Sequence, residues 1–231
     1  MALISYINLE RLNCFIDIHT HSYYQDEKTK LLLNVFPEET EKFKHPCFFS
    51  LGLHPWHVHA DSVEANLKWI EKHIANTNVL AIGEIGLDKT IAAPWKDQVY
   101  AFEKQLALAE KHCKPVILHC VRSYNELILY RNASNQQLPW IFHWFNASFE
   151  IARELIRKNC YLSFGHMLFN ENSKAYSVFT AISADSIFLE TDDAGHTIQE
   201  ISDRAALIKG MHLSQLMQQI NNNFTRCFGT L

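Results

Sequence analysis

Short runs of apolar residues alternate with amphipathic stretches along most of this chain. We expect eight strands, because the runs are almost continuous in apolar side chains, as in strands that are buried on both faces. The predicted strands are Cys14–Ile18, Lys30–Phe36, Cys47–Leu53, Val79–Gly83, Pro115–His119, Trp140–Phe145, Cys160–Phe164 and Ile187–Glu190.

Between most of these runs, apolar residues recur at helical spacing. One example places Val63, Leu67 and Ile70 on one side of a helix that Asp61 or Ser62 can cap. Strands that alternate with helices indicate βαβ units and a parallel sheet, and eight of them predict a closed TIM-type (β/α)8 barrel. The predicted helices are Ser62–Ile74, Asp97–His112, Glu150–Lys158, Lys174–Ile182 and His212–Asn222.

The first two connections are short for a parallel barrel. Only Ser22–Thr29 separates the first two predicted strands, and Pro37–Pro46 between the next two holds about two turns of helix at Glu38–Phe43. A parallel crossover normally takes about a dozen residues or more. Two explanations stay open: either the first helices are missing or very short, or Lys30–Phe36 is not a strand.

Length and composition fit one large domain over residues 1–231. Apolar residues make up 48% of the chain and charged residues 20%, which favours a sizeable core over disorder. The six cysteines form no CxxC pair, which favours a reducing, cytosolic compartment. We expect a monomer with no secretory signal in Met1–Asn13 and no membrane-spanning segment, since charged and polar residues interrupt every apolar run.

The formal net charge of −4 argues against a protein that binds nucleic acid mainly through its phosphate backbone, which would carry a positive excess. A nucleic-acid substrate would therefore have to be bound locally, by a basic rim or by metal ions.

The motif Asp17-Ile-His19-Thr-His21 ends the first predicted strand. Side chains alternate along a strand, so the two histidines point the same way, with Cα atoms roughly 6.5 Å apart, and can close on one metal ion. Asp17 has the same parity and can support them from behind. An isolated HxH is more often a pair of surface histidines, but its place at a strand end favours a site.

Further candidates follow other strands. Glu84 lies between glycines in Gly83-Glu-Ile-Gly86, where glycine lets the backbone pass close to a ligand and the carboxylate can bridge two cations. His54 follows the third predicted strand and can contact a substrate phosphate. Each alone is as easily a turn residue or a solvated carboxylate.

His119, His143 and Asp192 lie near the ends of three more predicted strands. Active sites of parallel barrels lie at the carboxyl ends of the strands, so a shared position is more informative than each residue alone. Four histidines, one Glu and one Asp suit Zn²⁺ or Mn²⁺, with Mg²⁺ also possible. The predicted metal ligands are His19, His21, Glu84, His119, His143 and Asp192. Of the remaining histidines, we expect His57, His166 and His196 to line the mouth of the site.

In chain order, DIHTH, GLHP, GEIGLD, FHWF and ETDD resemble the motifs of the TatD family of metal-dependent deoxyribonucleases, and the resemblance extends from Phe15 onward. It implies a TIM-type barrel that holds two divalent cations and acts as a 3'-5' exonuclease-like deoxyribonuclease on DNA. It also implies that His19, His21 and Asp192 bind one cation, that His119 and His143 bind the other, that Glu84 bridges them, and that His54 lies beside the substrate.

The chain departs from the family pattern at Lys89, where the family often has an aromatic residue, at Arg122, one residue late, and at Asp193. We predict Asp192, Glu84 and His54 as catalytic residues, with Asp192 accepting a proton from water, and Lys89, Arg122 and His54 as contacts to the substrate. Two alternatives remain. One is a hydrolase of the same barrel type that acts on an amide, ester or lactone. The other is a non-catalytic metal-binding barrel, which the shortened front of the barrel and the negative charge favour.

Overall fold

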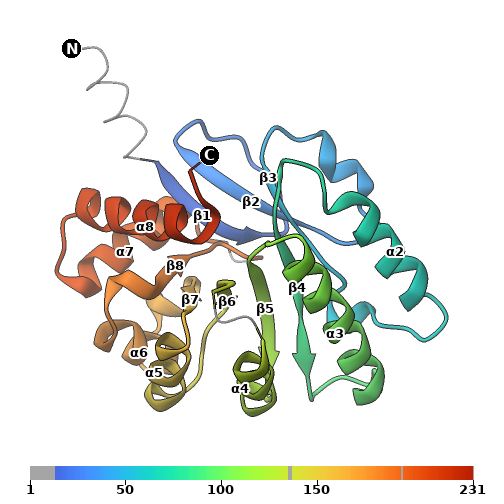
Figure 1. The fold of residues 1–231 in the computed structure, drawn as a ribbon. Coiled ribbons are helices and arrows are strands. Elements are labelled where there is room, and N and C mark those ends of the chain that lie inside the picture. Colours follow the sequence, from blue (N-terminus) through green and yellow to red (C-terminus); the bar gives the residue numbers. More distant parts are fainter. Residues whose placement is uncertain (1–13, 135–136, 194, 231) are drawn as a thin grey trace.

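Eight parallel strands follow one another in chain order around a nearly closed barrel (Figure 1). The computed structural model describes residues 14–134, 137–193 and 195–230. The barrel closes where Thr20 of the first strand forms a parallel bridge with Asp192, just after the last strand. The strands are β1 (Phe15–Thr20), β2 (Thr29–Val35), β3 (Phe48–Leu51), β4 (Val79–Asp88), β5 (Val116–Val121), β6 (Trp140–Phe142), β7 (Cys160–Phe164) and β8 (Ile187–Leu189). All eight predicted strands are confirmed, and β4 runs five residues past its predicted end at Gly83.

Helices cover the outside of the barrel from β3 onward (Figure 1). The five helices predicted from periodicity are confirmed with shifted ends, whereas α4 and α7 were not predicted from it. In α4, apolar residues follow one another without a helical period, and Leu129 among them is 68% exposed. The helices are α2 (Val63–His73), α3 (Trp95–Lys111), α4 (Tyr124–Ala133), α5 (Phe149–Arg157), α6 (Lys174–Ala181), α7 (Ile198–Lys209) and α8 (Leu213–Phe228).

The first crossover contains no helix in the structure. Phe15 pairs with Thr29 in parallel register, so the second strand was assigned correctly and the barrel is shortened at its front. Side chains hold the loop instead of a helix: Tyr24 Oη donates to Asp17 Oδ2 at 2.8 Å, and Thr29 Oγ1 donates to Asp26 Oδ2 at 2.7 Å. The second crossover carries a short 3₁₀ helix, η1 (Thr40–Lys44), in place of the expected turns of helix.

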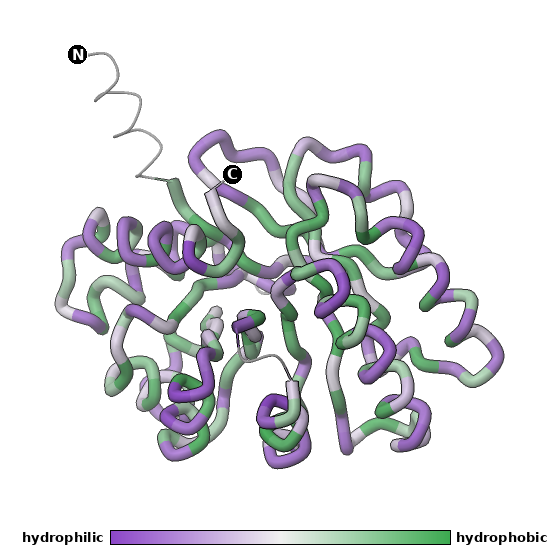
Figure 2. The backbone as a smooth tube through the Cα atoms, viewed as in Figure 1, coloured by the Kyte–Doolittle hydropathy of each residue, from purple (hydrophilic) through white to green (hydrophobic). Residues whose placement is uncertain are grey.

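The strands consist mainly of apolar residues, and the outer helices carry most of the polar ones (Figure 2), although buried polar side chains such as Asp17, Asn34 and Ser50 lie on the strands. Two buried glutamines of α3 tie this layer to the strand ends. Gln105 bonds the backbone N–H and C=O of Leu53 at 2.6 and 3.2 Å, and Gln98 bonds those of Asp88 at 2.9 and 3.0 Å. Because these backbone groups would otherwise be buried without partners, α3 fixes the two strand ends that carry His54 and Asp88.

No helix within the described residues combines the length and the apolar character that crossing a bilayer requires. The expected absence of a signal in Met1–Asn13 falls outside the described residues. The single-domain organisation and the monomeric state remain predictions.

Candidate functional site

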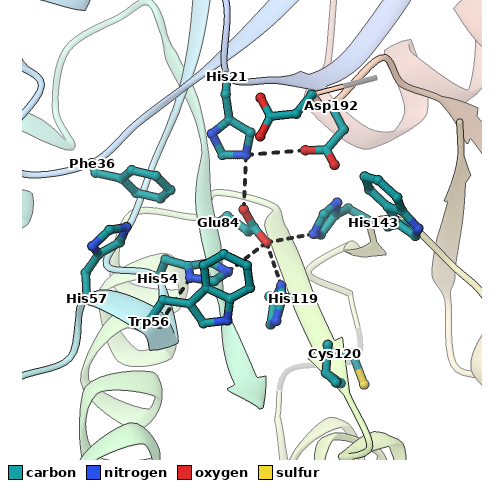
Figure 3. Close-up of a pocket in the computed structure, with 13 residues that line it drawn as sticks. His21, Phe36, His54, Trp56, His57, Glu84, His119, Cys120, His143 and Asp192 are labelled. Atoms are coloured by element: carbon teal, nitrogen blue, oxygen red, sulfur yellow. Dashed lines mark hydrogen bonds and ion pairs between the residues drawn. The ribbon is translucent and has the colours of Figure 1, made fainter. Parts of the chain in front are cut away.

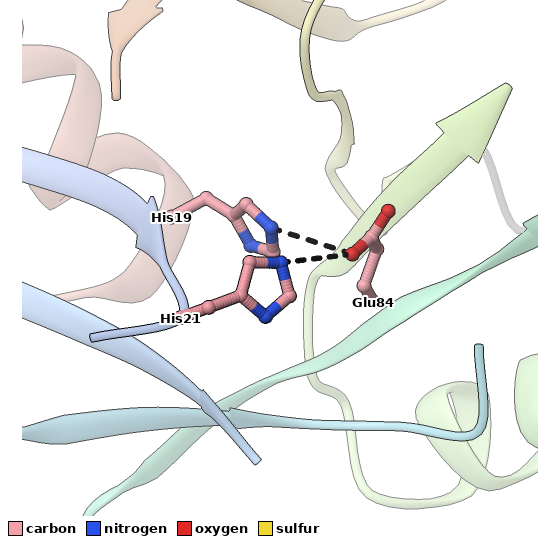
Figure 4. Close-up of side chains that lie close together, drawn as sticks. All are labelled: His19, His21 and Glu84. Atoms are coloured by element: carbon pink, nitrogen blue, oxygen red, sulfur yellow. Dashed lines mark ion pairs between the residues drawn. The ribbon is translucent and has the colours of Figure 1, made fainter. Parts of the chain in front are cut away.

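The six predicted metal ligands come together at the barrel mouth, around the carboxylate of Glu84; Figure 3 shows five of them, and Figure 4 shows His19 beside His21 and Glu84. They come from five different strands or from the residues directly after them, with Glu84 inside β4, so the barrel itself brings together residues that are up to 173 positions apart along the chain (His19 to Asp192). Glu84 is 3% exposed and His19 is fully buried, which places the centre of the cluster inside the barrel mouth.

The two oxygens of Glu84 face different histidines. Its Oε2 lies 3.4 Å from His19 Nε2 and 3.5 Å from His21 Nε2 (Figure 4). Its Oε1 lies 2.6 Å from His143 Nε2 and 2.8 Å from His119 Nδ1. One carboxylate thus stands between two sets of imidazoles, with one oxygen for each.

Asp192 completes the first set. Its Oδ1 lies 3.3 Å from His21 Nε2 and 3.6 Å from His19 Nε2. Its backbone N–H donates to the carbonyl of His19 at 3.0 Å, so the contact that closes the barrel also places this carboxylate. The first set therefore joins β1, β4 and the end of β8, and the second joins β4, β5 and the end of β6.

The backbone of β4 is held at Glu84 from both sides. The side chain of Asn34 on β2 accepts a hydrogen bond from the Glu84 backbone N–H at 2.7 Å. On the other side, a Cβ on Gly86 would lie 1.9 Å from the carbonyl oxygen of His119, and Gly86 has a φ of +152°. A Cβ on Gly83 would lie 2.6 Å from Ile117 Cβ. Gly83 and Gly86 therefore allow β4 to approach β5 closely, whereas we expected them to allow the backbone to approach a ligand.

Three buried carboxylates that the sequence analysis did not include among the site residues stand behind the ligands. Asp88 Oδ2 lies 3.3 Å from His119 Nε2, and Glu190 Oε1 lies 3.8 Å from His143 Nδ1. Asp17 accepts hydrogen bonds from the backbone N–H and the hydroxyl of Thr191 at 3.0 and 2.6 Å.

Carboxylates in such positions orient imidazole ligands and fix which ring nitrogen carries the proton. The sequence contains a signal for these three carboxylates, because each lies two or four residues along the chain from a predicted ligand and therefore has the same parity. The sequence-based prediction used this signal only for Asp17.

The charges of the cluster are coupled. Burial alone would raise the pKa of Glu84, but the neighbouring histidines, His143 and His54 first, hold it well below its usual value. Burial also opposes the ionisation of Asp192, yet its hydrogen bond with His21 lowers its pKa.

On the histidine side, burial disfavours the charged form, but Asp192 and Glu84 raise the pKa of His21 to about 10. Burial opposes the protonation of His143 as well, and the charge of Glu84 raises its pKa to about 9. Ionised carboxylates in this site thus favour positive charge beside them, and a divalent cation is a natural source of it.

The donor set fits divalent metal ions. Both ring nitrogens of His19 are buried without a hydrogen-bond partner, and burial lowers the pKa of this ring to about 4, so the imidazole is neutral near pH 7. A neutral buried imidazole with a free nitrogen that faces two carboxylates has the protonation state of a metal ligand. Imidazole and carboxylate together suit Zn²⁺ and Mn²⁺.

His54 has a different character. Its Nδ1 accepts the backbone N–H of Trp56 at 3.1 Å, so in the neutral ring the proton is on Nε2. Burial lowers the pKa of His54, which favours this neutral form. Nε2 lies 3.1 Å from Glu84 Oε1 and can donate there or to a substrate, but it cannot bind a cation while it carries the proton.

The cluster opens into a cavity of about 470 Å³, within the usual size of a small-molecule site. His57 lies in its wall, His166 packs against the wall residue Trp144 with ring centroids 4.7 Å apart, and His196 lines a neighbouring cavity. The residues that line the cavity are His21, Phe36, His54, Trp56, His57, Glu84, His119, Cys120, Val121, His143, Trp144, Asp192 and Asp193.

Lys89 and Arg122, the two basic residues predicted to contact the substrate, do not line this cavity. Lys89 forms an ion pair with Glu126 and lies over the ring of Trp95, 5.4 Å from its centroid. Arg122 is exposed, with a positive φ of 53°. The structure does not bring either residue together with the ligand cluster, and their role in phosphate binding remains a prediction.

The sequence profile of the TatD related DNase family matches residues 30–229. An uncharacterised metal-dependent hydrolase of Bacillus subtilis, YabD, is 34% identical over 148 residues, which are 63% of this chain and 58% of that protein. The 3'-5' ssDNA/RNA exonuclease TatD of Cronobacter sakazakii is 29% identical over 153 residues, 63% of this chain and 57% of that protein. The aligned part thus spans less than two thirds of either relative.

Among solved structures, the Escherichia coli TatD homologue YjjV superposes with a TM-score of 0.82 at 20% identity, over 95% of this chain and 100% of that one. A TatD family hydrolase of Entamoeba histolytica gives a TM-score of 0.77 at 15% identity, over 94% and 99% of the two chains. At these identities the superpositions establish the barrel fold alone.

Proposed function

Because the chain belongs to the TatD related DNase family, we propose that it is a metal-dependent hydrolase of phosphodiester bonds, acting as a 3'-5' exonuclease on DNA. The observation that carries the proposal is the position of the Glu84 carboxylate, whose two oxygens face two separate sets of histidines. A shared carboxylate between two imidazole sets suits a pair of cations that act on one phosphate group.

In this proposal, His19, His21 and Asp192 would hold one divalent cation and His119 and His143 the other, and Glu84 would contribute one oxygen to each. Such a pair of cations supplies a water of lowered pKa and neutralises the charge that develops on the phosphate. Asp88 holds the ring of His119 through Nε2 in the orientation that leaves Nδ1 for the cation, while Glu190 places a carboxylate 3.8 Å from His143 Nδ1.

Asp192 is the proposed proton acceptor. Its side chain is 10% exposed and lines the cavity, and the lowered pKa keeps it ionised at neutral pH. An ionised carboxylate beside the attacking water can take up the proton that the water loses.

His54 is the proposed donor to the substrate. Its neutral ring directs an N–H into the cavity from a position fixed by the backbone of Trp56, and it can bond a phosphate oxygen as charge builds on it. Lys89 and Arg122 would reach only those parts of a strand that extend beyond the cavity.

The test combines metal analysis of the purified protein with assays in Mn²⁺ or Zn²⁺ on single- and double-stranded DNA, a fluorogenic phosphodiester and a carboxylic ester. We expect metal-dependent cleavage of DNA and of the phosphodiester, and loss of turnover in Glu84→Ala with the fold retained by circular dichroism. Cleavage of the carboxylic ester alone would favour the amide, ester or lactone hydrolase. Full metal occupancy without turnover on any substrate would favour a non-catalytic barrel, and wild-type turnover in Glu84→Ala would overturn the proposed mechanism.

A further inference from the structure

We propose that Trp56 is a stacking platform for an unpaired nucleobase, so that the cavity favours strands that offer an unpaired base, of any kind, beside the scissile bond. This inference rests on the proposed phosphodiester hydrolysis and adds a specificity-determining residue to it.

The position of Trp56 carries the argument. Its side chain is 59% exposed although it lines the cavity beside two buried histidines, with ring centroids 5.0 Å from His54 and 6.0 Å from His119 (Figure 3). The indole is nonetheless fixed: its Nε1–H donates to Asp88 Oδ2 at 2.9 Å, and its backbone N–H donates to His54 Nδ1 at 3.1 Å. An aromatic ring that is anchored at its edge and open to solvent is a preorganised binding surface.

A second tryptophan lies in the same cavity wall, at the end of β6. Trp144 is 38% exposed and has a φ of 45°, a left-handed conformation that is rare for a bulky side chain. The backbone N–H of Trp144 donates to the buried Glu190 at 2.5 Å, which helps to hold this conformation. Such strain persists where the surroundings enforce it and is concentrated at functional sites. The cavity therefore presents a second aromatic side chain from the β6 side.

The charges of the cavity favour ring contacts over phosphate contacts. Among the described residues that line it, none is Lys or Arg, and Glu84, Asp192 and Asp193 are acidic. The proposed cations can bind one phosphate group, but the neighbouring phosphates of a strand find no lysine or arginine in this lining. The faces of a base can then add affinity that the neighbouring phosphates do not supply, and stacking on an aromatic ring tolerates every base.

Stacking on Trp56 would also favour single-stranded over double-stranded nucleic acid. In a duplex both faces of a base are already stacked, and a base reaches an external ring only after it has left the stack. One base on one aromatic ring changes affinity roughly 5- to 150-fold, converted from about 1 to 3 kcal/mol.

The test compares kcat/KM of the metal-loaded protein on two strands with the same backbone, a thymidine pentanucleotide and a pentamer of abasic residues. Trp56→Phe removes the bond to Asp88 but keeps a ring, whereas Trp56→Ala removes both. Phe149→Ala is the control, because Phe149 is an exposed aromatic residue, 40% exposed, that lies outside the cavity lining. Quenching of the protein's fluorescence by the pentanucleotide gives a dissociation constant that does not depend on turnover.

If Trp56 stacks a base, Trp56→Ala lowers kcat/KM on the pentanucleotide roughly 5- to 150-fold and weakens the binding of this strand equally. The same variant leaves kcat/KM on the abasic strand unchanged. Trp56→Phe retains most of the activity on the pentanucleotide. Equal losses on both strands, or equal losses in the Phe and Ala variants, would show that Trp56 acts only through Asp88 and would overturn the inference. Equal wild-type cleavage of both strands would also overturn it while the proposed function stands. Failure to cleave any phosphodiester would remove both.

Discussion

Replacing Glu84 with glutamine tests the site at its centre. The substitution keeps the shape of the side chain and removes the charge that faces both histidine sets, with five histidine nitrogens within 3.5 Å of its two oxygens. Loss of a residue that only supports a ligand costs about 10- to 100-fold in metal affinity. Glu84 stands in both proposed donor sets, so we expect at least about a 100-fold loss for each cation, or about 2.7 kcal/mol per cation.

The assay is a metal titration followed by dialysis and elemental analysis, with turnover measured on the same samples. At a free Mn²⁺ concentration that saturates the wild type, Glu84→Gln should retain less than one ion per chain and turn over at least about 100-fold more slowly. Its thermal midpoint in a chelator should fall below that of the metal-free wild type, because His21 and His143, whose pKa values Glu84 helps to raise, lose a buried counter-charge. Glu71→Gln, on the exposed pair with Lys111, is the matched control. Two ions bound to Glu84→Gln with wild-type affinity would refute the assignment of this carboxylate as the bridge.

Further predictions concern the supports of the site and the outer shell. Gly86→Ala should lower the free energy of unfolding by about 4 kcal/mol or more in urea titrations, because its Cβ would overlap the carbonyl of His119, whereas Gly195→Ala, with open space around it, should change it little. His54→Gln should keep wild-type metal content by elemental analysis but lower kcat/KM about 10- to 1000-fold, since this ring donates a hydrogen bond and does not bind a cation; loss of a cation would contradict its neutral role. Burial lowers the pKa of Lys209 to about 8. Between about pH 8 and 10.5 the unfolded chain therefore binds more protons than the folded protein. The contribution of Lys209 to the free energy of unfolding thus increases as the pH rises through that window. Lys209→Met should flatten that part of the pH profile, and an unchanged difference between the two proteins from pH 7.5 to 10.5 would contradict the burial of this amine.

Residues whose position follows from the strand pattern could be predicted from the sequence. Parity along a strand grouped His19 with His21, and a place at the carboxyl end of a predicted strand was the signal for Glu84, His119 and Asp192, since both follow from local geometry and the common direction of parallel strands. The predicted barrel with a shortened first crossover is confirmed by the parallel pairing of β1 with β2.

Contacts between segments far apart in the chain could not be predicted in this way. Nothing in the order of residues states that Asp88 receives the indole N–H of Trp56, 32 positions away, or that Asn34 holds the backbone of Glu84 from 50 positions away. These bonds depend on how neighbouring strands are staggered. The stagger in turn depends on the register shift in β4, which a period of two residues does not reveal.

The closure of the barrel and the proposed metal site are physically one feature. Thr20 and Asp192 form the bridge between the first and last strands, and the hydroxyl and backbone N–H of Thr191 bond to the carboxylate of Asp17 beside it. His19 and Asp192 face each other across this seam, so a cation bound by both would cross-link the two ends of the barrel. The shortened first crossover removes a helix from this part of the wall, and the polar bonds of Asp17 hold the seam from inside. A cation there would strengthen barrel closure by its binding free energy, which links the chemistry of the site to the stability of the shortened front.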